Sequence, residues 1–337
     1  MDFEEFVAFS VKHKASDLHL CSGHHPRLRI DGVLQSLQQY APLSDSWTQI
    51  LCQQLLNERQ YLKLQQKGQL DFSYTTKHGQ RLRGNFFQQQ HGLSVAFRLV
   101  SSHCPELKAL AAPAIIERLM QQEDGLILVT GATGNGKSTT LNAIIGAIHQ
   151  QGGRHIITLE DPIEYIHNEG SGLIQQRDLS CHTHCASAAL NAALRQDPDI
   201  ILLGELRDTA SIRLALTAAE TGHLVLATLH TRTAAQAVDR LIDVFPAEEK
   251  ACVRGQLAVG LVAVIAQKLA RKRGGGRIAL FEILVRSTAV SNLIREGKTH
   301  QLEGVMQTNG QLGMQTFSQG IQQRQKQKLL AEIEQEI

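Results

Sequence analysis

The most constraining feature of this chain is a loop that matches the pattern G-x-x-x-x-G-K-[ST] in full. The apolar run 126–130 directly before the loop is typical of a buried parallel strand. Apolar residues recur after the loop at helical spacing, from Leu141 to Ile148, and Gly152 ends that segment. The loop therefore has the flanking strand and helix that a phosphate-binding loop requires. It reads Gly131, Ala132, Thr133, Gly134, Asn135, Gly136, Lys137 and Ser138, and Thr139 follows.

These residue types suit the binding of ATP with Mg²⁺. Glycines allow backbone N–H groups to surround phosphates, and the positive end of the following helix favours anionic charge. Lys137 can reach the β- and γ-phosphates, while the Ser138 hydroxyl is placed to coordinate Mg²⁺. A glycine-rich turn without a ligand is the alternative, and the complete pattern with its flanks argues against it.

The length of 337 residues predicts two domains, each with its own core. Residues 1–100 are typical of a small α/β unit, and 101–113 have the composition of a linker. In 114–285, strands alternate with helices, which indicates a parallel sheet covered on both faces. Residues 286–337 are predicted to be helical, and we expect 320–328 to fray.

Periodicity predicts the elements of both domains. In the first, a helix near Phe3 accompanies a mixed sheet, together with one helix that Ser44 or Asp45 caps and that extends to Leu62. Its expected strands are 17–20, 27–30, 33–37, 69–75, 81–90 and 93–99. The second domain has expected strands at 126–130, 155–159, 200–203, 224–227 and 278–284, and helices at 186–194, 209–221, 233–244 and 288–295.

Charge and cysteine content limit the class of protein. A formal net charge of +2, with 20% charged residues, argues against a dedicated nucleic-acid binder. The chain begins without a secretory signal and has no apolar run long enough to span a membrane, so we expect membrane association only through partners. Six cysteines without an export signal suit reduced thiols in the cytoplasm. The Cys181–Cys185 stretch favours an ordinary loop over a metal site.

Carboxylates follow two of the expected strands, where ligands of parallel sheets bind. Glu160, Asp161 and Glu164 come after 155–159, and Glu205 comes after 200–203 in the Walker B position. Such acids can hold Mg²⁺, directly or through water, and can activate the attacking water. We assign Glu205 to the metal and Glu164 to the water, with Glu160 and Asp161 shaping the loop. A helix N-terminal acid is the alternative for Glu205.

Histidines and arginines supply further candidates. His230 follows the strand 224–227, where it can hydrogen-bond a phosphate or a carboxylate, whereas His223 precedes that strand and is equally compatible with a structural role. The even spacing of strand residues places Arg81 and Arg83 on one face. With Arg98 they form a possible phosphate clamp, although charge pattern alone favours solvated arginines.

Together these motifs resemble the ATPases of the type II and type IV secretion superfamily (GspE-like), and among them the PilT-type retraction ATPases of type IV pili. The resemblance spans almost the whole chain. It is carried by the Ala15-Ser16-Asp17-Leu18-His19-Leu20 run, the phosphate-binding loop, and residues 159–165, 201–208, 221–231 and 289–296.

The resemblance implies an N-terminal PAS-like α/β domain and a C-terminal RecA-like P-loop NTPase domain with a helical C-terminus. It implies a homo-hexamer that hydrolyses ATP with Mg²⁺ and acts on an inner-membrane pilus platform protein, from the cytoplasm, to power retraction and twitching motility. The resemblance also implies that Glu164 is the catalytic glutamate and Glu205 the Walker B glutamate. Arg81, Arg83 and Arg98 match arginines that contact the γ-phosphate.

Three alternatives remain open. A divergent paralogue with another client keeps the motor chemistry. A RecA-like nucleic-acid translocase would use the basic stretch 271–277 as a backbone-contacting loop. A non-enzymatic scaffold would bind ATP and turn it over slowly.

Overall fold

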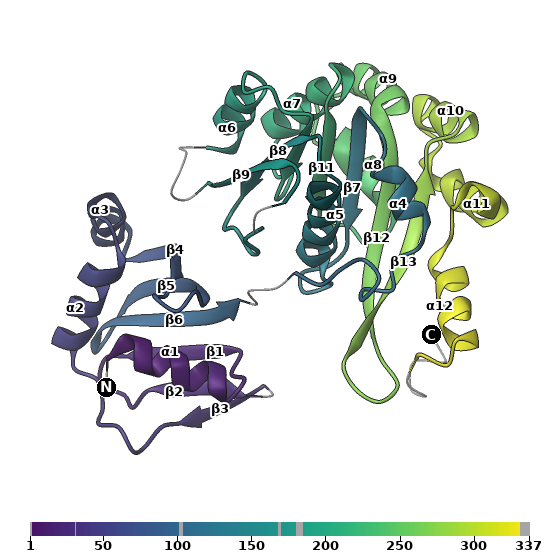
Figure 1. Cartoon of the computed structure of the whole chain (residues 1–337). Coiled ribbons are helices and arrows are strands. Elements are labelled where there is room, and N and C mark those ends of the chain that lie inside the picture. The colour runs from purple at the N-terminus through teal and green to yellow at the C-terminus, as the bar shows by residue number, and fades with distance from the viewer. Residues whose placement is uncertain (1, 31, 101–103, 168–169, 180–184, 331–337) are drawn as a thin grey trace. The chain divides into compact units, whose positions relative to one another are not determined.

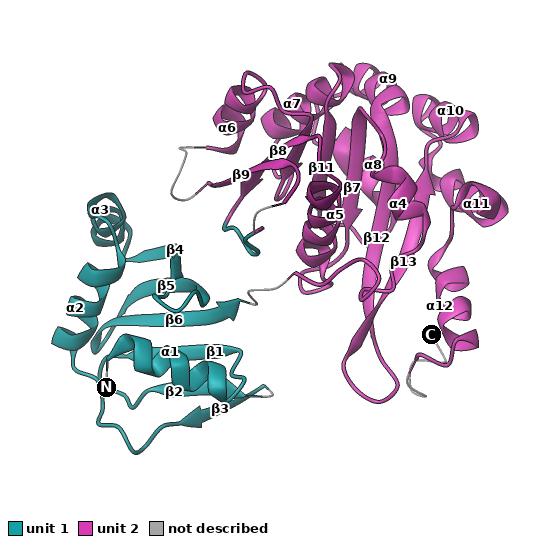
Figure 2. Ribbon diagram, in the orientation of Figure 1, with its two compact units in different colours: residues 1–103, 162–166 teal, residues 104–161, 167–337 magenta. Residues whose placement is uncertain are grey.

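The computed structural model of the chain describes residues 2–30, 32–100, 104–167, 170–179 and 185–330. The chain divides into two compact units, each with its own sheet (Figure 1, Figure 2). Unit 1 contains residues 1–103 and 162–166, and unit 2 contains 104–161 and 167–337. The short segment 162–166 therefore leaves the second unit and packs with the first.

Unit 1 is an antiparallel sheet with three helices. Its elements are α1 (Phe3–Lys12), β1 (Asp17–Cys21), β2 (Arg27–Ile30), β3 (Val33–Ser36), α2 (Asp45–Leu55), α3 (Glu58–Lys67), β4 (Gln69–Thr75), β5 (Arg81–Gln89) and β6 (Gly92–Val100). The strand order is β3-β2-β1-β6-β5-β4, and every pairing between these strands is antiparallel. The expectation of a mixed sheet in this unit is wrong.

Alternation along the strands separates the core of unit 1 from a polar face. Leu18, Leu82 and Phe97 are buried in the core with the helices. Their strand neighbours Asp17 and Arg83 point to the opposite face, because successive side chains alternate. The polar face therefore carries charged groups from several strands.

The expected single helix from Ser44 to Leu62 is two helices. Asn57 accepts a hydrogen bond from the backbone N–H of Gln60 (2.9 Å), and the Gln60 side chain accepts one from the Asn57 N–H (3.0 Å). This reciprocal capping box begins α3 after α2 has ended at Leu55. Leu56, which is extended, separates them.

Unit 2 is a seven-stranded sheet between layers of helices. Its elements are α4 (Ile115–Leu119), β7 (Gly125–Thr130), α5 (Lys137–Gln151), β8 (His155–Glu160), β9 (Leu173–Asp178), α6 (Ala186–Ala193), β10 (Ile200–Leu203), α7 (Thr209–Glu220), β11 (Leu224–Leu229), α8 (Ala234–Asp243), α9 (Lys250–Gly260), β12 (Leu261–Arg271), β13 (Arg277–Val285), α10 (Thr288–Glu296), η1 (Thr299–Gln301), α11 (Leu302–Thr308), η2 (Gly310–Leu312) and α12 (Phe317–Lys326).

The sheet order of unit 2 is β13-β12-β7-β11-β10-β8-β9. All neighbours are parallel except the β12–β13 hairpin, which is antiparallel. The five expected strands are present, and β9 and β12 are additional. The prediction of a wholly parallel sheet is corrected at this hairpin.

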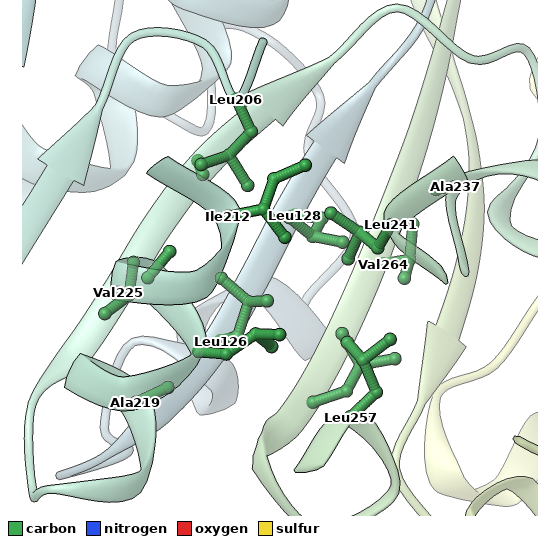
Figure 3. Packing of buried hydrophobic residues seen from close by; sticks show 14 of the residues in the cluster. Leu126, Leu128, Leu206, Ile212, Ala219, Val225, Ala237, Leu241, Leu257 and Val264 are labelled. Carbon is green, nitrogen blue, oxygen red and sulfur yellow. The ribbon is translucent and has the colours of Figure 1, made fainter. Parts of the chain in front are cut away.

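Residues of β7 show how both faces of the sheet are covered. Leu126 and Leu128 pack with α7, α8 and α9 on one face (Figure 3). Ile127 and Val129 pack with α4 and α5 on the other. Burial of apolar surface on both faces stabilises this strand by about 25 cal/mol per Å². Such a rigid sheet fixes the loops at its carboxyl edge.

The expected fraying of residues 320–328 is wrong for most of that stretch. Thr316 and Gln319 form a capping box at the start of α12, and Phe317 is buried. Lys268 places its ammonium 4.2 Å from the centre of the Phe317 ring.

Among the described residues, no helix is both long and apolar enough to cross a membrane.

Candidate active site

The phosphate-binding loop lies at the carboxyl end of β7, and α5 begins within it at Lys137. Gly131, Gly134 and Gly136 have φ values of 152°, 82° and 78°, which side-chain-bearing residues rarely adopt. Gly136 is the N-cap of α5. The loop is therefore held at the positive end of a helix, as an anion site requires.

Gln267 of β12 braces this loop, and sequence reasoning missed it. The side chain is 2% exposed. Its Oε1 accepts a hydrogen bond from Thr140 Oγ1 (2.7 Å), and its Nε2 donates to the Asn135 carbonyl (2.7 Å). Asn135 Nδ2 donates in return to the Gln267 carbonyl (3.2 Å). A polar residue inside the apolar run of β12 was the available signal.

Gly131→Ala is expected to lower the free energy of unfolding by about 2–4 kcal/mol, because it adds backbone strain and a collision. The new Cβ would lie 2.4 Å from the Gln267 carbonyl oxygen, a backbone atom. Gly134→Ala is the matched control, since its φ is also positive but no atom lies within 4 Å of its Cβ. Urea unfolding of both variants measures the difference. Equal losses would contradict the bracing by β12.

Lys137 is 8% exposed and points back into the loop. Its ammonium donates to the carbonyls of Gly131 (2.9 Å) and Ala132 (3.1 Å). Its Nζ also lies 3.3 Å from His230 Nδ1. These are the contacts for which a phosphate oxygen would compete. The lysine is thus already aimed at the loop interior.

His230 connects the phosphate-binding loop with Glu205. Its Nε2 lies 3.3 Å from Glu205 Oε1, and its Nδ1 faces Lys137 Nζ. An ammonium can only donate and a carboxylate can only accept, so the consistent neutral tautomer carries its proton on Nε2. Thr133 Oγ1 is 3.5 Å from the same Nδ1. Lys137, His230 and Glu205 therefore form one hydrogen-bonded chain.

Threonines fix the loops that carry this chain of contacts. Thr130, at the end of β7, accepts a hydrogen bond from the Thr231 N–H (3.0 Å) and so holds the loop beside His230. Thr228 Oγ1 donates to the carbonyl of Gly204, the residue before Glu205. Both threonines are buried. Sequence reasoning did not single out either residue.

Glu205 also pairs with Arg207, and Arg207 extends towards Asp161. The Glu205 Oε2 accepts from Arg207 Nε (2.8 Å), and Arg207 lies 4.0 Å from Asp161 Oδ2. The hydrogen bond to Glu205 raises the pKa of Arg207, against the opposing effect of burial. The loops after β8 and β10 therefore meet through this arginine.

Glu160 and Glu164 lie in different surroundings. Glu160 ends β8, is 4% exposed, and accepts hydrogen bonds from Thr158 Oγ1 (2.8 Å) and Gln176 Nε2 (3.3 Å). Glu164 belongs to residues 162–166, which pack with unit 1. There Arg81 Nε donates to the carbonyl of Ile163 (3.1 Å). The structure groups Glu164 with Arg81 rather than with the residues of the phosphate-binding loop.

The other two candidate arginines are neighbours on the polar face of unit 1. Arg83 of β5 lies opposite Arg98 of β6, Arg98 lies opposite Asp17, and Asp17 lies opposite Arg29. Arg98 Nε is 3.0 Å from Asp17 Oδ1, yet its side chain is 70% exposed. Burial raises the pKa of Asp17, but hydrogen bonds from Ser16 and Arg98 outweigh it and the pKa is lowered. Asp17 therefore stays charged between Arg29 and Arg98.

Two other candidates need separate mention. His223 Nδ1 lies 3.1 Å from the carbonyl of Ala218 at the end of α7, which gives it a structural partner. Of the Cys181–Cys185 stretch, residues 181–184 lie outside the described residues, and Cys185 is exposed. The described part of the chain contains no group of three His, Cys, Asp or Glu residues that could hold a metal ion.

Ser138 and Glu205 offer hard oxygen ligands, a hydroxyl and a carboxylate, which are the kind that Mg²⁺ prefers. The glycine cradle of the loop admits phosphate close to the backbone. The residues present therefore fit a nucleotide with its magnesium.

Comparisons with known proteins find similarity along nearly the whole chain. The sequence model of the family described as type II/IV secretion system protein matches residues 3–274. The uncharacterised protein YggR of Escherichia coli (strain K12) is 56% identical over 324 residues, which cover 96% of this chain and 98% of YggR. The type IV pilus retraction ATPase PilT of Pseudomonas aeruginosa (strain PAO1) is 45% identical over 317 residues, covering 94% and 92% of the two chains.

A solved structure agrees with this similarity. The crystal structure of the pilus retraction motor PilT with bound ADP superposes with a TM-score of 0.92 at 40% identity, covering 99% of this chain and 96% of that one. The expected fold class, an N-terminal PAS-like α/β domain with a C-terminal RecA-like ATPase domain, is confirmed by this agreement. The ADP in that structure supports nucleotide binding by the shared fold.

Proposed function

Since the chain belongs to the type II/IV secretion system protein family and is an ATPase, we propose that it is a motor of the pilus retraction type. The observation that carries this proposal is the contact chain from Lys137 through His230 to Glu205. It joins the phosphate-binding loop to the loop after β10, so a change at the terminal phosphate reaches two loops together.

Each site residue has a proposed role in hydrolysis. Residues 131–139 bind the phosphates, and Lys137 neutralises charge that develops on the β- and γ-phosphates. Ser138 and Glu205 would hold magnesium, directly or through water. When bound, the magnesium ion would neutralise part of the phosphate charge. Glu164 accepts a proton from the attacking water. His230 reports the state of the γ-phosphate to Glu205.

We assign Arg81, Arg83 and Arg98 to the γ-phosphate, as ligands that unit 1 supplies. Support comes from the row Arg29, Asp17, Arg98 and Arg83 on neighbouring strands, in which Asp17 pairs with Arg29 and Arg98 while Arg83 lies opposite Arg98. An anion stabilises such neighbouring like charges. The domain boundaries proposed with these roles are 1–100, 101–113, 114–285 and 286–337.

The proposed assembly is a homo-hexamer that acts in the cytoplasm, at the inner membrane, on the pilus platform protein. Sedimentation velocity with ATP is expected to show six chains per particle. Single chains under every nucleotide condition would contradict the ring.

Deletion of the gene in its own host tests the client. We expect excess surface filaments and loss of twitching motility, because assembly continues without retraction. The wild-type chain should restore both, and the Lys137→Ala variant should restore neither. Unchanged filaments and motility would contradict pilus retraction and leave a related secretion-type machine as the client.

The β12–β13 hairpin favours one other candidate, a nucleic-acid translocase. Arg271, Lys272, Arg273 and Arg277 are all exposed, and none forms a salt bridge with another described residue. Exposed cations of this kind bind phosphate backbones in a salt-dependent way. DNA-stimulated hydrolysis that declines with salt would support this candidate over the retraction motor.

A further inference from the structure

The segment that carries Glu164 returns to unit 2 at His167, and there it is tied to the helix of the phosphate-binding loop. His167 Nε2 lies 2.9 Å from Asn142 Oδ1 on α5. Asn142 Nδ2 donates to the carbonyl of Ser138 (3.0 Å), which fixes the orientation of the amide. The amide oxygen can only accept, so His167 carries its ring proton on Nε2 and donates it.

Gln176 of β9 contacts the residues that flank this segment on both sides. The His167 N–H donates to Gln176 Oε1 (3.0 Å). Gln176 Nε2 donates to Glu160 Oε1 (3.3 Å), where β8 ends. Residues 161–166 are therefore bounded on both sides by groups bonded to Gln176 of β9. A short chain with both ends fixed has few conformations available to it.

Burial keeps the His167 donor in place. Asn142 is 2% exposed. Burial, with a smaller effect of the neighbouring His149, lowers the pKa of His167 to about 4. The ring lies over Gly146, whose added Cβ would be 3.6 Å from ring atoms Cε1 and Nδ1. The imidazole is therefore neutral near pH 7, with one proton to donate and a defined seat on α5.

We propose that His167 and Asn142 form an anchor that positions the segment carrying Glu164. Asn142 lies on the first turns of α5, where its side chain also bonds to the carbonyl of Ser138. Both residues act through others, so they are positioning residues. The anchor links the group that contacts the nucleotide with the segment that activates water. This inference rests on the proposed role of Glu164.

The test compares two His167 variants with one control. His167→Leu removes the donor, while His167→Gln keeps an N–H near the position of Nε2. We expect His167→Leu to lower kcat for ATP at least about tenfold, since small misplacements of reacting groups have large effects on rate. KM for ATP should stay within about twofold, and His167→Gln should keep at least about half of the wild-type kcat.

His155→Leu is the matched control. His155 begins β8 and is also half-buried. Its Nδ1 lies 2.8 Å from the Asp197 carbonyl oxygen, and its Nε2 lies 3.2 Å from Oε1 of Gln175 on β9, the strand that also carries Gln176. This variant tests whether loosening β9 is by itself sufficient to lower kcat. We expect His155→Leu to keep the wild-type kcat. Asn142→Ala, which removes the acceptor, should reproduce the kcat loss of His167→Leu and serves if the leucine variant does not fold.

Glu164→Gln separates this inference from the proposed function. If Glu164→Gln abolishes turnover and His167→Leu does not, the anchor is overturned and the role of Glu164 stands. If Glu164→Gln keeps wild-type turnover, the proposed base is wrong and the anchor falls with it. In support, adding His167→Leu to Glu164→Gln should cause no further loss of kcat. Equal losses in His167→Leu, His167→Gln and His155→Leu would indicate general loosening and overturn the anchor.

Discussion

Lys137→Ala is expected to abolish ATP hydrolysis and to weaken nucleotide binding. The ammonium is buried, donates to two carbonyls of its own loop, and lies 3.3 Å from His230 Nδ1. Alanine removes the positive charge from these contacts and takes the ammonium donor away from His230 Nδ1. Removing one preorganised charge contact from a developing transition state costs roughly 100- to 1,000-fold in rate.

Phosphate release and the anisotropy of a fluorescent ADP analogue measure the two effects of Lys137→Ala. Lys272→Ala is the control. This substitution removes the same charge from the protein, but Lys272 lies in the exposed β12–β13 hairpin. It should hydrolyse and bind as the wild type does. Wild-type turnover by Lys137→Ala would show that the loop around Gly136 is not the nucleotide site.

The phosphate-binding loop could be predicted from sequence because its function depends on local chemistry. Backbone N–H groups, a lysine and a hydroxyl at fixed spacing need only a strand before and a helix after them. The structure places that loop between β7 and α5 as expected. The position of His230 beside Glu205 was also predictable, since parallel strands bring their carboxyl ends to one edge.

Gln267 and Thr130 were not predictable, because their partners are distant in sequence. Gln267 contacts Asn135 across 132 positions, and Thr130 contacts Thr231 across 101. Residue type alone does not reveal such pairs, since a polar residue in an apolar run has several explanations. The register of β12 beside β7 decides the first pair. That register depends on tertiary packing, which periodicity does not contain.

The errors in secondary structure have local physical causes. Strand β12 follows α9 at once, without a turn residue other than Gly260, so the change from helical to extended backbone left no clear boundary. The run Leu261–Arg271 is rich in β-branched and apolar residues, which was the overlooked signal for a strand. The apolar residues of α2 and α3 recur at helical spacing across the boundary between them, so periodicity predicted one helix. The Asn57 capping box, which begins α3, was not considered.

Glu205→Gln should separate binding from cleavage. Glutamine keeps the size of the side chain and an oxygen that can accept from Arg207 or His230, but it removes the negative charge. We therefore expect the fluorescent ADP analogue to bind within about threefold of wild type while kcat falls at least about 100-fold, since a magnesium-linked charge contributes chiefly to the transition state.

The control for Glu205→Gln is Glu249→Gln, which also breaks an arginine pair in unit 2. Glu249 pairs with Arg213, and it lies at the start of α9. Loss of an exposed ion pair is worth about 0–1 kcal/mol, so this variant should keep its turnover.

Lys137→Ala and Glu205→Gln then differ in a diagnostic way, since the first loses binding and hydrolysis and the second loses hydrolysis alone. Wild-type turnover by Glu205→Gln would leave the contact from His230 without a catalytic partner and would reduce it to a structural link between loops.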